Sequence, residues 1–179
     1  MVLLSALPNI LPLTAHASGV SGGGGNVMFP VNPLNPAAVE EVTEKLSLAR
    51  PSVASYFEGK EALLEVGSLT DDEAAIFAPL FQAGKGIVAT ARESGLEIEQ
   101  NKPCFDSSAT PFDGSTHSQR QGAVCVSALS ISKKVERDDI AAQSAALLAH
   151  EFTEVLGFSE DHAVRVQSKV LADFRRLQP

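Results

Sequence analysis

The first charged side chain in this 179-residue sequence is Glu40, and this limits the part of the chain that can fold into a domain. Residues 2–13 are mostly apolar and are followed by Ala15 and Ala17, in the small-x-small pattern of a signal-peptide cleavage site. No Lys or Arg precedes this apolar run, although signal peptides ordinarily carry one there. We expect residues 1–17 to be a signal peptide that directs export to a periplasmic or extracellular space.

The next segment, residues 18–36, contains consecutive glycines at 22–25 and prolines at 30, 33 and 36. This composition predicts a flexible tether, so the folded domain is expected over residues 37–179. A glycine run cradles phosphate when a strand precedes it and a helix follows, and neither is predicted here. The apolar run before the tether is short and interrupted by prolines, so we expect no stable membrane span after the signal peptide is removed.

The composition excludes several functional classes. The net charge is −8 and no cluster of Lys or Arg is present, which argues against a nucleic-acid partner. Hydrophobic residues make up 44% of the chain, enough for a real core. The 2 cysteines are too few for a cysteine-rich zinc module, so any metal site must use carboxylates.

Export also bears on the two cysteines. In an oxidising compartment, Cys104 and Cys125 are expected to form a disulfide that ties the intervening polar loop to a strand. The alternative is two free, buried thiols.

Hydrophobic periodicity and end signals predict an α+β fold. Helices are expected over 36–50, over 52–64 with an end near Gly67, and over 71–84, with Pro51 ending or restarting the first of them. Strands are expected near 96–99 and 123–131, separated by a long loop at 104–122. A motif helix, a glycine turn at Gly157 and a final helix from Ser159 close the chain. The segment 87–90 fits a strand or a helix equally well.

The motif helix contains the residues that most strongly indicate chemistry. His150 and Glu154 are four positions apart and therefore share one helix face, with Glu151 on the adjoining face. After Gly157 the chain reverses, and Glu160 returns at the start of the next helix, followed by Asp161 and His162. A helix, a glycine turn and a second helix can thus bring ligands from both helices around one cation.

The segment from Ala145 to His162 resembles the zincin-like metallopeptidases, which carry the motif HExxH. The resemblance extends over about residues 96–171, and it is closest to small exported bacterial proteins with a cysteine-containing polar loop before the motif helix. It implies a bound Zn²⁺, a peptide or protein substrate, and Glu151 as the general base. The chain departs from the family at the second histidine, where Glu154 makes the motif HExxE.

Three ligand sets remain open. In the first, His150, Glu154 and Glu160 bind Zn²⁺, and two carboxylates cancel its charge and weaken its acidifying effect. In the second, which we prefer, His162 replaces Glu160, giving the His₂Glu composition of known catalytic zinc sites. In the third, His117 joins from the polar loop, which a Cys104–Cys125 disulfide could hold close to the motif helix.

Two functional hypotheses follow from this sequence. The first is an exported zincin-like metalloprotein, a zinc-dependent peptidase with Glu151 as its base. The second is a non-catalytic interaction protein on the same scaffold, which Glu154 favours because the most diagnostic zinc ligand is replaced. The sequence carries no sign of an oligomeric state.

Overall fold

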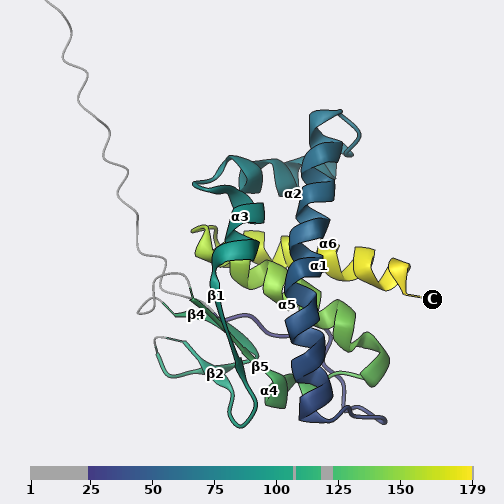
Figure 1. Ribbon diagram of the computed structural model, residues 1–179, viewed down its shortest axis with the longest axis vertical. Helices are drawn as coiled ribbons and strands as arrows, with labels where there is room; N and C mark the ends of the chain where they lie inside the picture. Colours follow the sequence, from purple (N-terminus) through teal and green to yellow (C-terminus); the bar gives the residue numbers. More distant parts are fainter. Residues whose placement is uncertain (1–23, 107, 118–122, 179) are drawn as a thin grey trace, which may run out of the picture.

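The computed structural model describes residues 24–106, 108–117 and 123–178, and it confirms the α+β class. The described residues form six α-helices and a small sheet, and helices α1 to α3 precede the sheet in the chain. Figure 1 shows the long helix α1 lying beside α5 and α6, with the strands gathered at one end of the helical layer. The predicted signal peptide at residues 1–17 lies outside the described residues.

Helix α1 (Val39–Glu65) is continuous, so the prediction of two helices divided at Pro51 was wrong. Proline lacks the N–H that would bond to the carbonyl of Ser47, and this costs about 3 kcal/mol in a helix interior. The loss is tolerated because both halves of the helix bury the same face in the core while Pro51 itself is exposed. The buried side chains on either side of the proline are Val42, Leu46 and Ala49 before it, and Val53, Ala54 and Phe57 after it.

Helix α2 (Asp71–Gln82) begins where its acidic first turn predicted, and Thr70 caps it. The Thr70 hydroxyl accepts a hydrogen bond from the Glu73 amide, and the Glu73 carboxylate accepts one from the Thr70 amide. The ambiguous segment that follows is helical, as α3 (Gly86–Glu93).

Helices α1, α2 and α6 are joined by a cluster of charged side chains. The Lys60 and Lys169 ammonium groups each lie 2.8 Å from the Glu73 carboxylate, and 3.1 and 2.7 Å from Asp173. The Tyr56 hydroxyl donates to Asp173 at 2.9 Å. Hydrogen bonds from the two lysines lower the pKa of Glu73 to about 2. This cluster holds α6 against the helical layer and thereby positions the residues at its start.

The main sheet has the strand order β1-β5-β4. Strands β1 (Gly95–Glu99) and β5 (Ala123–Ser127) are parallel, and the edge strand β4 (Gly114–His117) runs antiparallel to β5. Strand β5 is shorter than predicted, because the Ser127 hydroxyl caps α4 (Ala128–Ser132) from within the expected strand.

The expected long loop at 104–122 is more ordered than predicted. Besides β4, it contains a second, two-stranded sheet of β2 (Cys104–Phe105) and β3 (Pro111–Phe112). The predicted disulfide is confirmed: Cys104 on β2 is bonded to Cys125 on the central strand β5, with their Cα atoms 5.9 Å apart.

The C-terminal unit matches the prediction closely. A short 3₁₀ turn, η2 (Arg137–Asp139), leads into α5 (Ile140–Val155), and Gly157 turns the chain with a φ of 86°. The Ser159 hydroxyl then caps α6 (Glu160–Leu177). Helix α5 is buried along almost its whole length, between α1, α6 and the strands β4 and β5.

The segment expected to be a flexible tether is packed onto the domain over residues 24–28. Gly24, Gly25 and Val27 are buried, and hydrogen bonds join the segment to β4, α5 and α6. The prediction failed because composition reports the freedom of an isolated glycine run, whereas here the missing side chains let the backbone approach α5 closely. Residues 18–23 of the predicted tether lie outside the described part of the chain.

In the described part of the chain, no single helix is both long and apolar enough to cross a membrane, and only the bent pair α2 and α3 meets these criteria jointly.

The disulfide is expected to contribute strongly to stability. Replacing Cys104 and Cys125 together with serine should lower the free energy of unfolding by about 3 kcal/mol, because the bond closes a loop across 21 positions. Urea denaturation followed by circular dichroism measures the loss, and reduced wild-type protein should show the same value. A loss well below about 1 kcal/mol would contradict the expectation.

Candidate functional site

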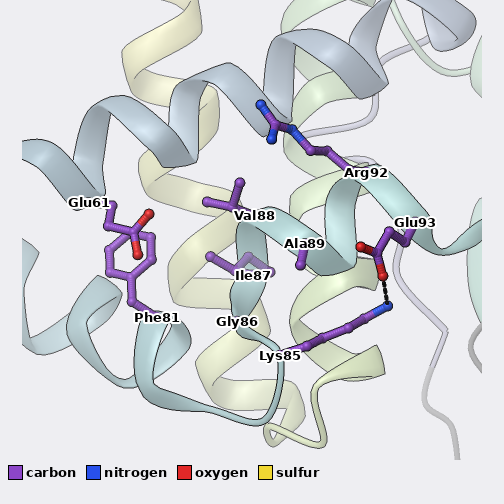
Figure 2. Close-up of a pocket in the computed structure, with 9 residues that line it drawn as sticks. All are labelled: Glu61, Phe81, Lys85, Gly86, Ile87, Val88, Ala89, Arg92 and Glu93. Carbon is purple, nitrogen blue, oxygen red and sulfur yellow. Dashed lines mark hydrogen bonds and ion pairs between the residues drawn. The ribbon is translucent and has the colours of Figure 1, made fainter.

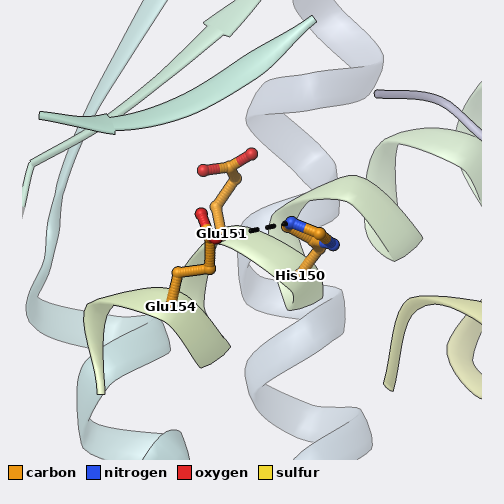
Figure 3. Close-up of side chains that lie close together, drawn as sticks. All are labelled: His150, Glu151 and Glu154. Atoms are coloured by element: carbon orange, nitrogen blue, oxygen red, sulfur yellow. Dashed lines mark ion pairs between the residues drawn. The ribbon is translucent and has the colours of Figure 1, made fainter. Parts of the chain in front are cut away.

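Three motif residues meet on α5. Nitrogen and oxygen ligand atoms of His150, Glu151 and Glu154 all lie within 4.8 Å of one another, and all three residues are buried. Figure 3 shows the three side chains leaving one stretch of the helix, with the imidazole of His150 facing the Glu154 carboxylate. The helical spacing recognised in the sequence therefore produces a real cluster.

His150 is the centre of this cluster. Its side chain is only 1% exposed, and Nε2 lies 3.9 Å from Glu154 Oε1 and 3.4 Å from Glu160 Oε2. Among the described residues, neither ring nitrogen has a hydrogen-bond partner. A buried imidazole normally uses at least one nitrogen in a hydrogen bond, so an unsatisfied ring surrounded by carboxylates is an unusual arrangement.

Glu160 joins the cluster from the neighbouring helix. The Gly157 turn and the Ser159 cap place it as the first residue of α6, beside His150. Its side chain is 53% exposed, unlike the side chains of His150 and Glu154. Glu160 is therefore the side of the cluster that opens to solvent.

Glu151 occupies the other side, in a space formed by two glycines. Its carboxylate is fully buried; Oε1 accepts a hydrogen bond from the Gly25 amide at 3.0 Å, and Oε2 has no partner among the described residues. A Cβ atom added at Gly25 or at Gly114 would lie 2.6 Å from Glu151 Oε1. Sequence reasoning missed both glycines, because their role depends on contacts between distant segments. The glycine run at 22–25 was the available signal.

The electrostatics of the cluster are dominated by like charges. Burial and the neighbouring Glu154 raise the pKa of Glu151 well above its ordinary value. Burial, together with the hydrogen bond and charge of Glu160, raises the pKa of Glu154 to about 8. The pKa of Glu160 is lowered instead, chiefly by its interaction with His150. The raised pKa favours the protonated form of the Glu154 carboxyl near neutral pH.

His162, a ligand in the preferred set, does not join the cluster. Its Nε2 lies 3.0 Å from the Ile76 carbonyl oxygen on α2, and its ring stacks on Phe158 with centroids 4.8 Å apart. Two positions along a helix correspond to about 200° of rotation, so Glu160 and His162 cannot both point at His150. The structure thus places Glu160, and not His162, beside His150, while the three residues whose ligand atoms all lie within 4.8 Å of one another are His150, Glu151 and Glu154.

The third ligand set depended on His117. The backbone of His117 belongs to β4, and the side chain of His117 lies outside the described part of the chain. Strand β4 does border the cluster, because the Thr116 hydroxyl lies 3.4 Å from Glu154 Oε2. The disulfide joins β2 to β5, and β5 pairs with β4 in the main sheet.

A separate cavity of about 280 Å³ lies between α1, α2 and α3 (Figure 2). Its two basic side chains are paired, Lys85 with Glu93 at 3.1 Å and Arg92 with Glu58. None of the cluster residues lines this cavity. It is therefore unrelated to the cluster on α5.

Comparisons with known protein families, with curated proteins and with solved structures found no match for this chain.

Proposed function

We propose that this chain is an exported zincin-like metalloprotein that binds Zn²⁺ through His150, Glu154 and Glu160 and hydrolyses peptide bonds with Glu151 as general base. The observation that carries the proposal is the buried His150 ring, which lacks a hydrogen-bond partner among the described residues and faces three carboxylates. The disulfide is compatible with export.

The donor chemistry of the cluster fits a divalent cation. Besides cysteine thiolates, imidazole nitrogens and carboxylate oxygens are the usual zinc ligands in proteins. The interactions that shift the pKa values of Glu151 and Glu154 come from other carboxylates, the Gly25 amide and the Thr116 hydroxyl, with no contribution from a described Lys or Arg. A bound cation would supply the positive charge that the cluster lacks, and it would give one of the two unpartnered ring nitrogens of His150 a ligand bond.

The remaining parts of the site have separable roles. Bound Zn²⁺ would polarise a substrate carbonyl and make water a better nucleophile. Glu151 would accept the proton of the attacking water on its free Oε2 and pass it to the leaving amine. Burial raises the pKa of Glu151, which makes its carboxylate a stronger base, and the close approach of Gly25 and Gly114 excludes bulk water from it.

The carboxylates of the proposed ligand set favour slow hydrolysis of peptide bonds. Two carboxylate ligands cancel the charge of Zn²⁺ and reduce its effect on water. A second candidate function, a non-catalytic exported interaction protein, is favoured by this charge balance and by the burial of Glu151. The first function requires both turnover and a bound metal ion. The second requires no turnover and can do without the metal ion.

Zinc content tests the ligand set. Purified protein dialysed against Zn²⁺ should retain about one ion per chain, measured by inductively coupled plasma mass spectrometry. His150→Ala should lose it, because the only imidazole of the set is removed, whereas the matched change His162→Ala should retain it. Protein that binds no zinc, or zinc binding that survives His150→Ala, would overturn the proposal.

Turnover tests the role of Glu151. Cleavage of a synthetic peptide library, read by mass spectrometry, should fall at least about 100-fold in Glu151→Gln while zinc content is unchanged. The exposed Glu65 at the end of α1 supplies the control, because Glu65→Gln should cleave like the wild type. Equal cleavage by Glu151→Gln and wild type would exclude Glu151 as the base.

The raised pKa of Glu154 predicts how stability depends on pH in the presence of a chelator. The folded protein binds this proton more tightly than the unfolded chain does, since the pKa is raised from 4.5 to about 8. The associated stability is fully present below about pH 4.5 and is lost as the pH rises through about 8. The melting temperature should therefore fall across this range, and less steeply in Glu154→Gln than in Glu65→Gln. Identical pH profiles in these two variants would contradict the prediction.

A further inference from the structure

Residues 24–28, which we call the strap, lie across the site between β4 and α5. On the side of β4, the Gly114 amide donates to the Gly25 carbonyl at 2.9 Å. On the side of α5, the Gly25 amide donates to Glu151 at 3.0 Å. The strap therefore fills the space between the edge of the sheet and the motif helix, directly over the carboxylate assigned as the base.

The rest of the strap is held through its backbone by side chains of the domain. The Val27 amide donates to Asp113 at 3.0 Å, and the Asn26 carbonyl accepts from Gln167 at 2.8 Å. The Gln143 amide group pairs with both backbone groups of Met28, at 3.1 and 2.7 Å. Asp113, Gln143 and Gln167 are all buried, so the side chains that hold the strap are themselves fixed in place. These side chains hydrogen-bond to main-chain groups of the strap. The same contacts are therefore available to any extended peptide of suitable shape.

Steric limits define which peptide fits. A Cβ atom at Gly25 would lie 2.6 Å from Glu151 Oε1 and 2.8 Å from His150 Cδ2, and one at Gly24 would lie 2.2 Å from the Phe112 ring. These positions accept glycine without rearrangement. The position of Val27 is buried at 3% exposure and selects an apolar side chain. The preferred pattern is therefore Gly-Gly-x-apolar.

The strap also has a built-in point of release. Phe29, the next residue, has a φ of 53°, a left-handed conformation that is strained for a bulky side chain, and it is 70% exposed. The anchors that follow, at Val31 and Leu34, hold the chain to Lys134 and Glu136 independently of the strap. The strap can thus rotate away at Phe29 while the connection to α1 stays in place.

We propose that the cleft between β4 and α5 is a binding site for an extended peptide of the pattern Gly-Gly-x-apolar, and that the strap is its occupant in cis. The role of this peptide as a substrate rests on the proposed function, because it requires Glu151 to act as the base. Binding itself requires no metal ion. In the full chain the strap competes with peptides in trans and keeps Glu151 and His150 covered.

Peptide binding in the presence of a chelator tests the cleft. The probe is a fluorescein-labelled peptide with the sequence of residues 24–31, Gly-Gly-Asn-Val-Met-Phe-Pro-Val, followed by fluorescence anisotropy. Val27→Asp in the full chain should release the strap, because a carboxylate would replace the buried side chain next to Asp113. It should bind the probe at least tenfold more tightly than the matched control Val31→Asp, which changes a half-exposed valine of the same segment. A probe with valine in place of its second glycine should bind at least tenfold more weakly.

Chemical footprinting of His150 gives a second measurement with a different variant. Diethylpyrocarbonate should modify His150 slowly in the wild type, and at least tenfold faster in Gly25→Val, where the new side chain displaces the strap. Gly59→Val is the matched control, because a Cβ at Gly59 meets no atom within 4 Å. His162, which is partly exposed, serves as the internal reference in the same digest.

The outcomes separate the two proposals. Equal probe binding by Val27→Asp and Val31→Asp, or unchanged modification of His150 in Gly25→Val, would overturn the cleft, even if the protein binds zinc. Tight probe binding by a protein that binds no zinc would support the cleft and overturn the zinc site.

Discussion

The burial of three ionisable side chains on one helix is the constraint on which the rest of the structure depends. Helix α5 is covered by α1, α6 and the sheet, so His150, Glu151 and Glu154 have almost no access to water. Burying an unpaired charge is costly, and the described structure supplies no Lys or Arg to these groups. Protonation of Glu154 relieves part of the cost in the absence of a cation, and a bound divalent cation would relieve more of it.

The surrounding elements give the cluster on this helix two different sides. Glu160, set by the Gly157 turn, forms the solvent side of the cluster, and the charged contacts of Lys60 and Lys169 hold α6 in the position that this requires. On the opposite side, Gly25 and Gly114 bring two backbones into contact with Glu151. A cation and a peptide would therefore approach from different sides and meet at the motif residues.

Local signals in the sequence predicted much of this arrangement, and the failures have identifiable causes. Helix ends at Gly157 and Ser159 were predictable because a left-handed turn and a hydroxyl cap act within a few residues. Pro51 was misread because tertiary burial on both sides of it outweighs a local penalty. His162 was misassigned because two residues that are close in sequence can point to different sides of a helix. The ring of His162 points toward the Ile76 carbonyl instead.

The sequence by itself determined the α+β class, the two-helix unit around Gly157, and the set of residues that could carry chemistry. It did so because periodicity, capping and i,i+4 spacing are local properties of the chain. Only the tertiary structure decided that Glu160 and not His162 faces His150, and that residues 24–28 cover Glu151. Those outcomes depend on how α6 rotates against α2 and on how a side-chain-free backbone fits between β4 and α5. Both are contacts between segments distant in sequence, which no local pattern encodes.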